Sequence, residues 1–414
     1  MKKLTFLLIS VFVSLLSFAG EVTEQDALQK AQQFMKGKQF KQMNLHRAPS
    51  MAGNAYYVFN AEDGGFVIVS GDDRTAEILG YSETGVFDWG KAPSNVKWLL
   101  NFYKQFIDHL GTNPTQARSS DTPVSASDKK TITSFVKTQW GQFAPYNNQC
   151  PELNGERCAT GCVATAMAQI INYCKWPQEQ TGTVAAYQTG TEKINMSQLS
   201  PTSFDWDHMQ EADIARLMLY CGQSVQMDYG IVESGAMVED APFKDVFGYS
   251  KSVRIISRDV MYSEWENILY DELANNRPIL YKGGNHAWVI DGYKDGLFHM
   301  NWGWDGDLDG YYKITDLTED DFVIKYEWNQ SALIGILPPS KAEDTSAKVI
   351  VNSMGFATET IIDNIGYLKR TTTSEDFPVV NISSELYCDL PSVQEVGIGL
   401  LDSKGVLRCF AQGQ

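Results

Sequence analysis

The clearest pattern of apolar and polar positions lies between Ala159 and Pro177, where apolar side chains recur every three or four residues. The recurring positions are Val163, Ala166, Met167, Ile170, Ile171 and Cys174. This spacing places them on one face of a helix. Thr160 is a candidate N-cap, Gly161 allows a sharp entry, and Pro177 ends the pattern. We therefore expect Cys162 in the first turn of a buried helix.

A cysteine at this position has two interpretations. The backbone amides and the positive end of the helix dipole favour a thiolate at Cys162, and the thiolate is the nucleophilic form. The small side chains of Ala164 and Ala168 would let another element approach closely. The alternative is a buried, inert helix cysteine, which is the commonest fate of a free thiol. This stretch alone does not separate a nucleophile from a packed side chain.

The N-terminal third shows the patterns of a small α+β unit. An amphipathic helix is predicted over Glu21–Gly37, and two strand-like runs within Ala55–Val69 are joined by a glycine-rich turn. A strong amphipathic helix follows over Ser94–Leu110, with Gly111 as its stop signal. We expect residues 21–111 to fold as a unit of their own.

A polar stretch then separates this unit from the rest. Residues 112–131 are rich in Ser and Thr and nearly free of large apolar side chains, which predicts an exposed linker and processing region. Residues 132–338 form a larger domain, helical at first and strand-like later. The strand-like runs are Pro278–Tyr281, Ala287–Tyr293, Leu297–Trp302, Gly310–Ile314 and Ser331–Leu337. Helices early and a sheet late predict the α+β class.

The last part of the chain, residues 341–414, has β-like runs separated by turn residues. We expect a small β-rich domain. An immunoglobulin-like sandwich is one alternative, but about 75 residues are few for that fold, so an incomplete domain is another.

Composition and charge indicate the class of partner and the location of the mature protein. The net charge of the 414-residue chain is −17, which argues against nucleic-acid binding because phosphates need Lys and Arg. Residues 1–20 carry two lysines, an apolar run and a small-residue ending, as in a secretory signal peptide. A membrane anchor is the alternative, but the run is short for a span. We expect a mature protein that is secreted or on the cell surface and has no membrane span.

The chain shows no pattern that calls for a cofactor or a metal. Its seven cysteines have no paired spacing, and the Cys158–Cys162 spacing lacks the second half of a zinc site. The segment Asp305–Gly310, with Asp316 at the twelfth position, imitates a calcium loop. Its flanks read as strands, so an acidic turn is the simpler interpretation, and calcium stays open.

A catalytic thiol needs a base within hydrogen-bond reach, and this is nearly always histidine. Of the five histidines, His286 follows two glycines and begins a strand-like run, which would hold it rigidly. It comes 124 residues after Cys162, near the spacing of about 130–150 residues in papain-type enzymes. His299 lies inside the next strand-like run, where a packed imidazole is the simpler interpretation.

Further residues complete a candidate site. Asn301 could accept a hydrogen bond from His286, and the ring of Trp302 could shield that bond from water. An oxyanion hole needs donors near the nucleophile. The backbone amide of Cys162 is one candidate, and the side chain of Gln142 is the other.

Four motifs occur in order along the chain: Trp140–Asn147, Ala159–Ile170, His286–Tyr293 and Phe298–Tyr312. They closely resemble the streptopain family of secreted bacterial cysteine peptidases, in particular its interpain type. The resemblance covers the chain from the signal peptide to about Pro338. It implies a papain-like fold with an N-terminal inhibitory prosegment, residues 21–111, that is removed on maturation.

The resemblance also implies roles for single residues. Cys162 would be the nucleophile, His286 the general base and Gln142 part of the oxyanion hole. Asn301 matches the papain-type asparagine, whereas the family is described as a Cys–His dyad helped by tryptophan, here Trp302. The glycine-rich active-site loop of streptopain is replaced by Thr318–Lys325. Substrate preference is therefore not carried over.

The combined prediction is a secreted cysteine endopeptidase made as a zymogen, with proteins or peptides as substrates and its own prosegment as an intramolecular inhibitor. One alternative is a Cys–His amidase acting on cell-wall peptide, which would need no prosegment. Another is a non-enzymatic adhesion or binding protein that uses the C-terminal β-domain. Oligomeric state and physiological substrate do not follow from the sequence.

Overall fold

The computed structural model describes most of the chain as two compact units. The described residues are 20–40, 46–50, 53–112, 129–258, 265–314, 330–339, 349–356, 382–388, 397–401 and 407–412. The first unit comprises residues 1–92, 96–128 and 310–325, and the second comprises 93–95, 129–309 and 326–414. Most of the predicted signal peptide and the predicted linker lie outside the described residues.

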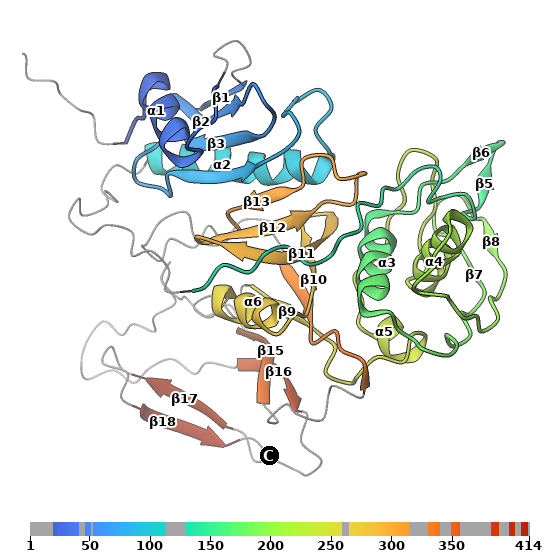
Figure 1. The fold of residues 1–414 in the computed structure, drawn as a ribbon. Coiled ribbons are helices and arrows are strands. Elements are labelled where there is room, and N and C mark those ends of the chain that lie inside the picture. Colours follow the sequence, from blue (N-terminus) through green and yellow to red (C-terminus); the bar gives the residue numbers. More distant parts are fainter. Residues whose placement is uncertain are drawn as a thin grey trace, which may run out of the picture. The chain divides into compact units, whose positions relative to one another are not determined.

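The first unit is an antiparallel sheet with two helices (Figure 1). The helices are α1 (Glu24–Phe34) and α2 (Ser94–Thr112). The strands are β1 (His46–Ser50), β2 (Gly53–Asn60), β3 (Phe66–Ser70), β4 (Ile78–Ser82) and β13 (Gly310–Tyr312), in the order β1-β2-β3-β4-β13. The predicted hairpin forms between β2 and β3, with Asn60 opposite Phe66.

The helices of this unit form where the apolar periodicity predicts them. The side chain of Thr23 caps α1 by accepting a hydrogen bond from the amide of Asp26. The apolar face of α2 is buried, and the hydroxyl of Tyr103 donates to the carbonyl of Leu79 at 2.8 Å. Gly111 does not stop α2, because the helix continues to Thr112. A terminal glycine permits a helix end without enforcing one.

The strand β13 comes from a distant part of the sequence. It forms within the predicted strand-like run, and its partner is β4, with Tyr311 opposite Tyr81 and Tyr312 opposite Gly80. The rings of Tyr81 and Tyr311 stack at 5.2 Å between their centroids. Chain order alone did not indicate this pairing, because more than 200 residues separate the two strands.

The second unit combines a sheet with a group of helices. Its helices are α3 (Cys162–Cys174), α4 (Glu211–Ser224), α5 (Ala241–Asp245) and α6 (Trp265–Ala274). Its sheet strands are β9 (Arg254–Ser257), β10 (Ile279–Gly283), β11 (His286–Lys294), β12 (Leu297–Asn301) and β14 (Ser331–Ile334), in the order β12-β11-β10-β14-β9. Two short hairpins complete the unit. In one, β5 (Glu152–Leu153) pairs with β6 (Glu156–Arg157). In the other, β7 (Tyr187–Gln188) pairs with β8 (Asn195–Met196).

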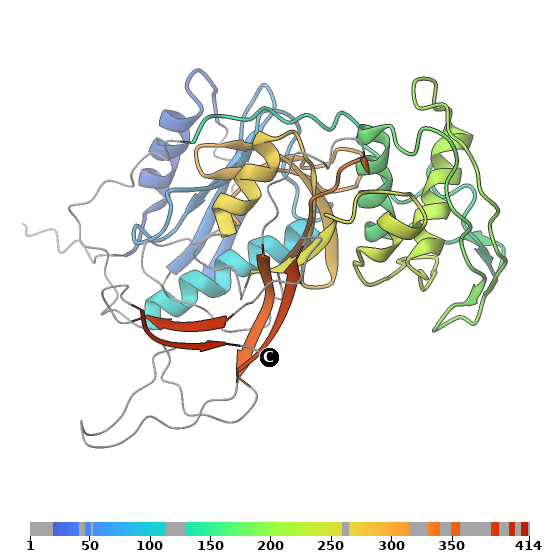
Figure 2. The same ribbon diagram turned by 90° about the horizontal axis from the view of Figure 1, so that it is seen from below.

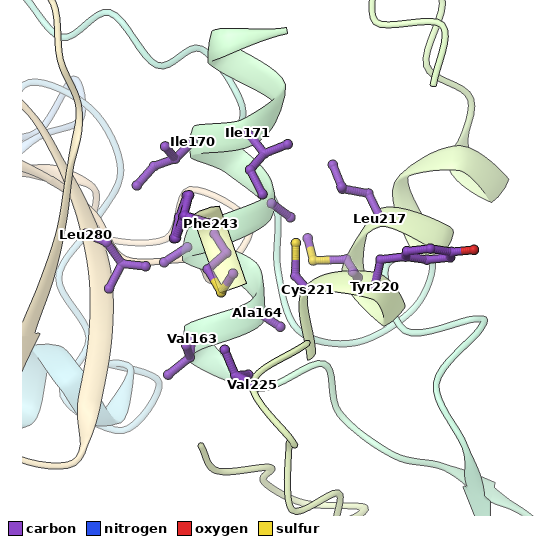
Figure 3. Packing of buried hydrophobic residues seen from close by; sticks show 14 of the residues in the cluster. Val163, Ala164, Ile170, Ile171, Leu217, Tyr220, Cys221, Val225, Phe243 and Leu280 are labelled. Atoms are coloured by element: carbon purple, nitrogen blue, oxygen red, sulfur yellow. The ribbon is translucent and has the colours of Figure 1, made fainter. Parts of the chain in front are cut away.

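Helix α3 is the centre of this unit's core. In Figures 1 and 2 it lies between α4 and the strands of the sheet. Figure 3 shows Leu280 of β10 on one side of α3, and Leu217 and Cys221 of α4 on the other. Nine consecutive residues of α3, from Val163 to Ile171, are buried. The apolar periodicity predicted one buried face, but helix and sheet together cover α3 on all sides along this stretch.

The ends of α3 differ in detail from the prediction. The N-cap is Gly161, not Thr160, and it makes no side-chain capping bond. The hydroxyl of Thr160 instead pairs with that of Thr165 at 2.8 Å. The helix ends at Cys174, with Lys175 in the left-handed conformation, so it stops before Pro177. The position of Cys162 as the first helical residue is as predicted.

The described residues of the C-terminal part form two antiparallel strand pairs. Strand β15 (Val349–Phe356) pairs with β16 (Ile382–Cys388), and β17 (Gly397–Leu401) pairs with β18 (Leu407–Gln412). This agrees with a β-rich region, whereas an immunoglobulin-like sandwich is not confirmed. Within the part of the chain that the structure describes, no helix is both long and apolar enough to cross a bilayer.

Candidate active site

Cys162 is fixed by the tight turn that precedes it. Gly161 has a φ of +86°, and a Cβ added there would lie 2.7 Å from the side chain of Met227 and 3.0 Å from the carbonyl oxygen of Ser234. Only glycine fits this conformation and this space. The turn therefore delivers Cys162 to the start of α3 in one defined orientation.

The thiol of Cys162 lies against the start of β11. Burial raises the pKa of this thiol, and the backbone amides of Ala287, Val163 and Cys162 itself act more weakly in the opposite direction. The expected lowering by the helix terminus is present but outweighed. In this state the cysteine is a neutral thiol that needs a base.

His286 supplies a candidate base at the same place. It is the first residue of β11, opposite Gly283 of β10, and β11 packs against α3, which begins at Cys162. Burial lowers the pKa of the imidazole, and the negative charge of Glu233 works against that shift. A half-buried, neutral imidazole beside a thiol can take up its proton.

Gln142 lies next to the turn that carries the thiol. Its carbonyl accepts a hydrogen bond from the amide of Thr160 at 3.0 Å, two residues before Cys162. The residue is buried. Within the described part of the chain its side-chain amide has no hydrogen-bond partner, so the amide is available as a donor. The role of Gln142 in an oxyanion hole stays a prediction.

Asn301 is not hydrogen-bonded to His286. Its amide nitrogen donates to the carbonyl of Thr138 at 2.6 Å, and its oxygen accepts from Gln169 at 2.9 Å and from the amide of Gly303 at 3.2 Å. It stands opposite Val289 on β11. The side chain thus ties three chain segments together, and the expected bond to the imidazole is absent because both ends of the amide are already used.

Trp302 is a fully buried support for the region around His286. Its ring packs at 5.0 Å from the ring of Trp288, two residues after His286 on β11. The indole nitrogen donates to the carbonyl of Leu308 at 3.0 Å, and the backbone amide donates to Asp309 at 2.9 Å. These bonds fix the ring in place, which agrees with a shielding role and not with direct proton transfer.

A short segment of the N-terminal region belongs to the second unit. Residues 93–95 cluster with the second unit, and Asn95 is almost fully buried. Its side-chain amide donates to the carbonyl of Trp302 at 2.9 Å. Sequence patterns did not single out Asn95, since a polar residue in the first turn of a helix is usually exposed.

Two other residues near the candidate site, Gln169 and Glu233, were not predicted from the sequence. Gln169, inside α3, bonds the hydroxyl of Thr138 and the side chain of Asn301, although the helix pattern marks it only as polar. Glu233 acts electrostatically on both Cys162 and His286 from a loop that has no helical or strand periodicity. Its closeness to the site comes entirely from the tertiary fold.

Metal binding finds no support in the described residues. They contain no group of three or more His, Cys, Asp or Glu side chains that could hold an ion. Asp316, the twelfth position of the calcium-like segment, lies outside them, as does Thr318–Lys325.

Comparison with known proteins agrees with this geometry. Residues 140–312 match the Peptidase C10 family, and residues 19–107 match the Spi protease inhibitor family. Streptopain of Streptococcus pyogenes is 32% identical over 329 residues, which cover 70% of this chain and 82% of streptopain. The thiol protease/hemagglutinin PrtT of Porphyromonas gingivalis is 30% identical over 372 residues, covering 78% of this chain and 42% of PrtT.

A solved structure shows the same arrangement of elements. The prointerpain A fragment of Prevotella intermedia superimposes with a TM-score of 0.60 at 30% identity, covering 72% of this chain and 99% of the fragment. The likeness includes a prosegment together with a papain-like domain. The predicted fold class, α+β with an N-terminal prosegment and a papain-like domain, is confirmed.

Proposed function

This chain belongs to the streptopain family of cysteine endopeptidases, peptidase family C10, and from that premise we propose that Cys162 and His286 are its catalytic dyad. The observation that carries the proposal is that α3, which begins at Cys162, packs against β11, which begins at His286. The backbone amide of Ala287, the residue after His286, is also among the groups that lower the pKa of the Cys162 thiol.

The proposed reaction starts with proton transfer from Cys162 to His286. The thiolate attacks the carbonyl carbon of a peptide bond, and the resulting oxyanion accepts hydrogen bonds from the Cys162 amide and the Gln142 side chain. His286 then protonates the leaving amine, which leaves an acyl-enzyme on Cys162. A water molecule, deprotonated by His286, releases the acid and regenerates the thiol.

We further propose that the chain is exported as a zymogen. Residues 1–20 have the features of a signal peptide, and residues 19–107 match a protease inhibitor family. The prointerpain A fragment, whose name marks a precursor, aligns over most of this chain. Residues 21–111 would then keep the enzyme silent until the segment 112–131 is cut, and the product would be secreted or held on the cell surface.

A digestion assay tests the function and separates its rivals. The purified chain is incubated with an unfolded protein, with and without a thiol-alkylating reagent. A cysteine endopeptidase cleaves the protein into fragments and loses this activity on alkylation. An amidase restricted to cell-wall peptide leaves the protein intact but releases fragments from that peptide, and an adhesion protein does neither.

A further inference from the structure

The loop Gly230–Met237 is bound directly to the turn that carries the nucleophile. The carbonyl of Gly230 accepts from the amide of Ala159 at 3.0 Å, and the hydroxyl of Ser234 donates to the carbonyl of Ala159 at 2.8 Å. The same hydroxyl accepts from the amide of Gly230 at 3.0 Å. These bonds attach the loop to the chain three residues upstream of Cys162.

Glu233 is the charged residue of this loop. Its side chain is exposed, and its charge acts on both Cys162 and His286. Two apolar side chains of the same loop are also exposed to an unusual degree, Val232 at 82% and Met237 at 64%. The loop therefore carries one carboxylate, Glu233, and an exposed apolar side chain both before it and after it in the sequence.

We propose that Glu233 is a specificity-determining residue that selects peptides with Lys or Arg within two residues of the scissile bond. An extended peptide advances about 3.3 Å per residue, so a carboxylate on the loop that is bonded to the turn before Cys162 is within reach of the substrate residues nearest the cleaved bond. Lys and Arg have an aliphatic stem below their charge. Val232 and Met237 can contact that stem while Glu233 pairs with the charge. The inference rests on the proposed dyad, since it places the scissile bond at Cys162.

The test compares peptides that differ in one side chain. Internally quenched peptides carry Lys, norleucine or Glu at each of the two positions on either side of the scissile bond. We measure kcat/KM with the full-length chain after it has processed itself. At the position that faces Glu233, the Lys peptide should be preferred over the norleucine peptide by about 10-fold at low salt, and by less at high salt.

Three variants decide the result. In Glu233→Gln the ratio between the Lys and norleucine peptides should fall to near one, and in Glu233→Lys the Glu peptide should become the preferred one. Glu239→Gln removes an exposed carboxylate from the same region and should keep the ratio of the unmodified enzyme. A ratio is the readout because Glu233 also influences the dyad itself, and that effect is the same for all peptides.

The outcomes separate this inference from the proposed function. The inference is overturned if no position prefers Lys, or if Glu233→Gln keeps the preference while Cys162→Ala is inactive. Hydrolysis by Cys162→Ala at the unmodified rate would overturn the dyad, and the inference with it. Loss of the preference in Glu233→Gln but not in Glu239→Gln supports a local role, as opposed to an effect of the chain's overall negative charge.

Discussion

The carboxylate of Asp291 lies 2.5 Å from Nδ1 of His299, and its other oxygen accepts a hydrogen bond of 2.7 Å from the amide of Val136. Asp291 is completely buried, and His299 stands on β12 opposite Gly292 of β11. The pair joins two strands to the segment that leads into Gln142. This accounts for His299 as a structural residue and leaves His286 as the candidate base.

Replacing His299 should mainly cost stability. His299→Ala leaves a buried carboxylate without its partner, so we expect a loss of about 3 kcal/mol in the free energy of unfolding. Urea denaturation in a Cys162→Ala background measures this without self-digestion. The His299→Ala enzyme should still turn over substrate at temperatures where it stays folded. Complete inactivity of well-folded His299→Ala would contradict the assignment.

Replacing the nucleophile should abolish activity without unfolding the chain. Alanine suits the first turn of a helix, so Cys162→Ala should keep its circular dichroism spectrum and lose peptide hydrolysis. It should also accumulate as an uncut precursor on a gel. Cys174→Ala, at the other end of α3, is the matched control and should remain active. Hydrolysis by a folded Cys162→Ala protein would mean that another group attacks the substrate.

Replacing His286 should remove turnover, because His286 is the residue proposed to take up the proton of the Cys162 thiol. We expect His286→Ala to lower kcat by at least about 100-fold, the lower range for loss of a general base. The variant should also react more slowly with iodoacetamide at neutral pH, since burial raises the pKa of the Cys162 thiol and the base that ionises it is gone. Unchanged alkylation together with unchanged kcat would exclude His286 from the dyad.

The free energy of unfolding should depend on pH through the buried carboxyl of Asp309. Burial raises the pKa of its carboxyl to about 7, whereas an unfolded aspartate titrates near 4. Between these values the folded chain holds a proton that the unfolded chain has lost. Stability from this group is therefore present at low pH and decreases as the pH rises through this window, by up to about 4 kcal/mol.

Asp309→Asn isolates this contribution. The amide oxygen can still accept the bond from Trp302, and it does not ionise. The stability of the variant relative to the parent should therefore increase between pH 5 and pH 8, both measured by urea denaturation in the Cys162→Ala background. A difference that does not change with pH would show that Asp309 is ionised throughout.

The buried side chain of Asn95 offers a test of what keeps the proposed precursor inactive. Asn95→Ala removes the bond to the carbonyl of Trp302, and we expect the precursor to become active with a shorter lag. Asn101→Ala is the matched control, because Asn101 is an exposed asparagine on the same helix. A time course of peptide hydrolysis from the full-length precursor measures the lag. Equal lags in both variants would place the latency elsewhere.

Much of the fold followed from periodicity, because each element has its own apolar pattern. Helix α3, helix α2 and the β2–β3 hairpin lie where spacing and turn residues predict them. Errors occurred at the ends. Thr160 has the right chemistry for an N-cap, yet Gly161 takes that place because only glycine fits against Met227 and Ser234.

The site was predictable where a residue's role shows in its local sequence. Cys162 and His286 each stand at the start of an element, with Gly161 directly before Cys162 and Gly284 two residues before His286. The bond expected between Asn301 and His286 does not form, because the side chain of Asn301 bonds Thr138 and Gln169, which lie far away in the sequence. Glu233 and Asn95 gave no signal at all, since their importance comes from what the fold brings next to them.

If the chain is processed as proposed, the pairing of β13 with β4 makes activation a change in backbone hydrogen bonding as well. Both strands exchange backbone hydrogen bonds, continued by the bond from the amide of Lys313 to the carbonyl of Leu79 at 2.9 Å. Cutting residues 112–131 leaves these bonds in place, so a nicked precursor stays assembled until its N-terminal part dissociates. Once that part has left, Gly310–Tyr312 has an open strand edge, which is a template for pairing with any extended chain. In the proposed maturation, the freshly processed peptidase would thus be the form most prone to self-association, and digestion of the released N-terminal part would prevent it from pairing with that edge again.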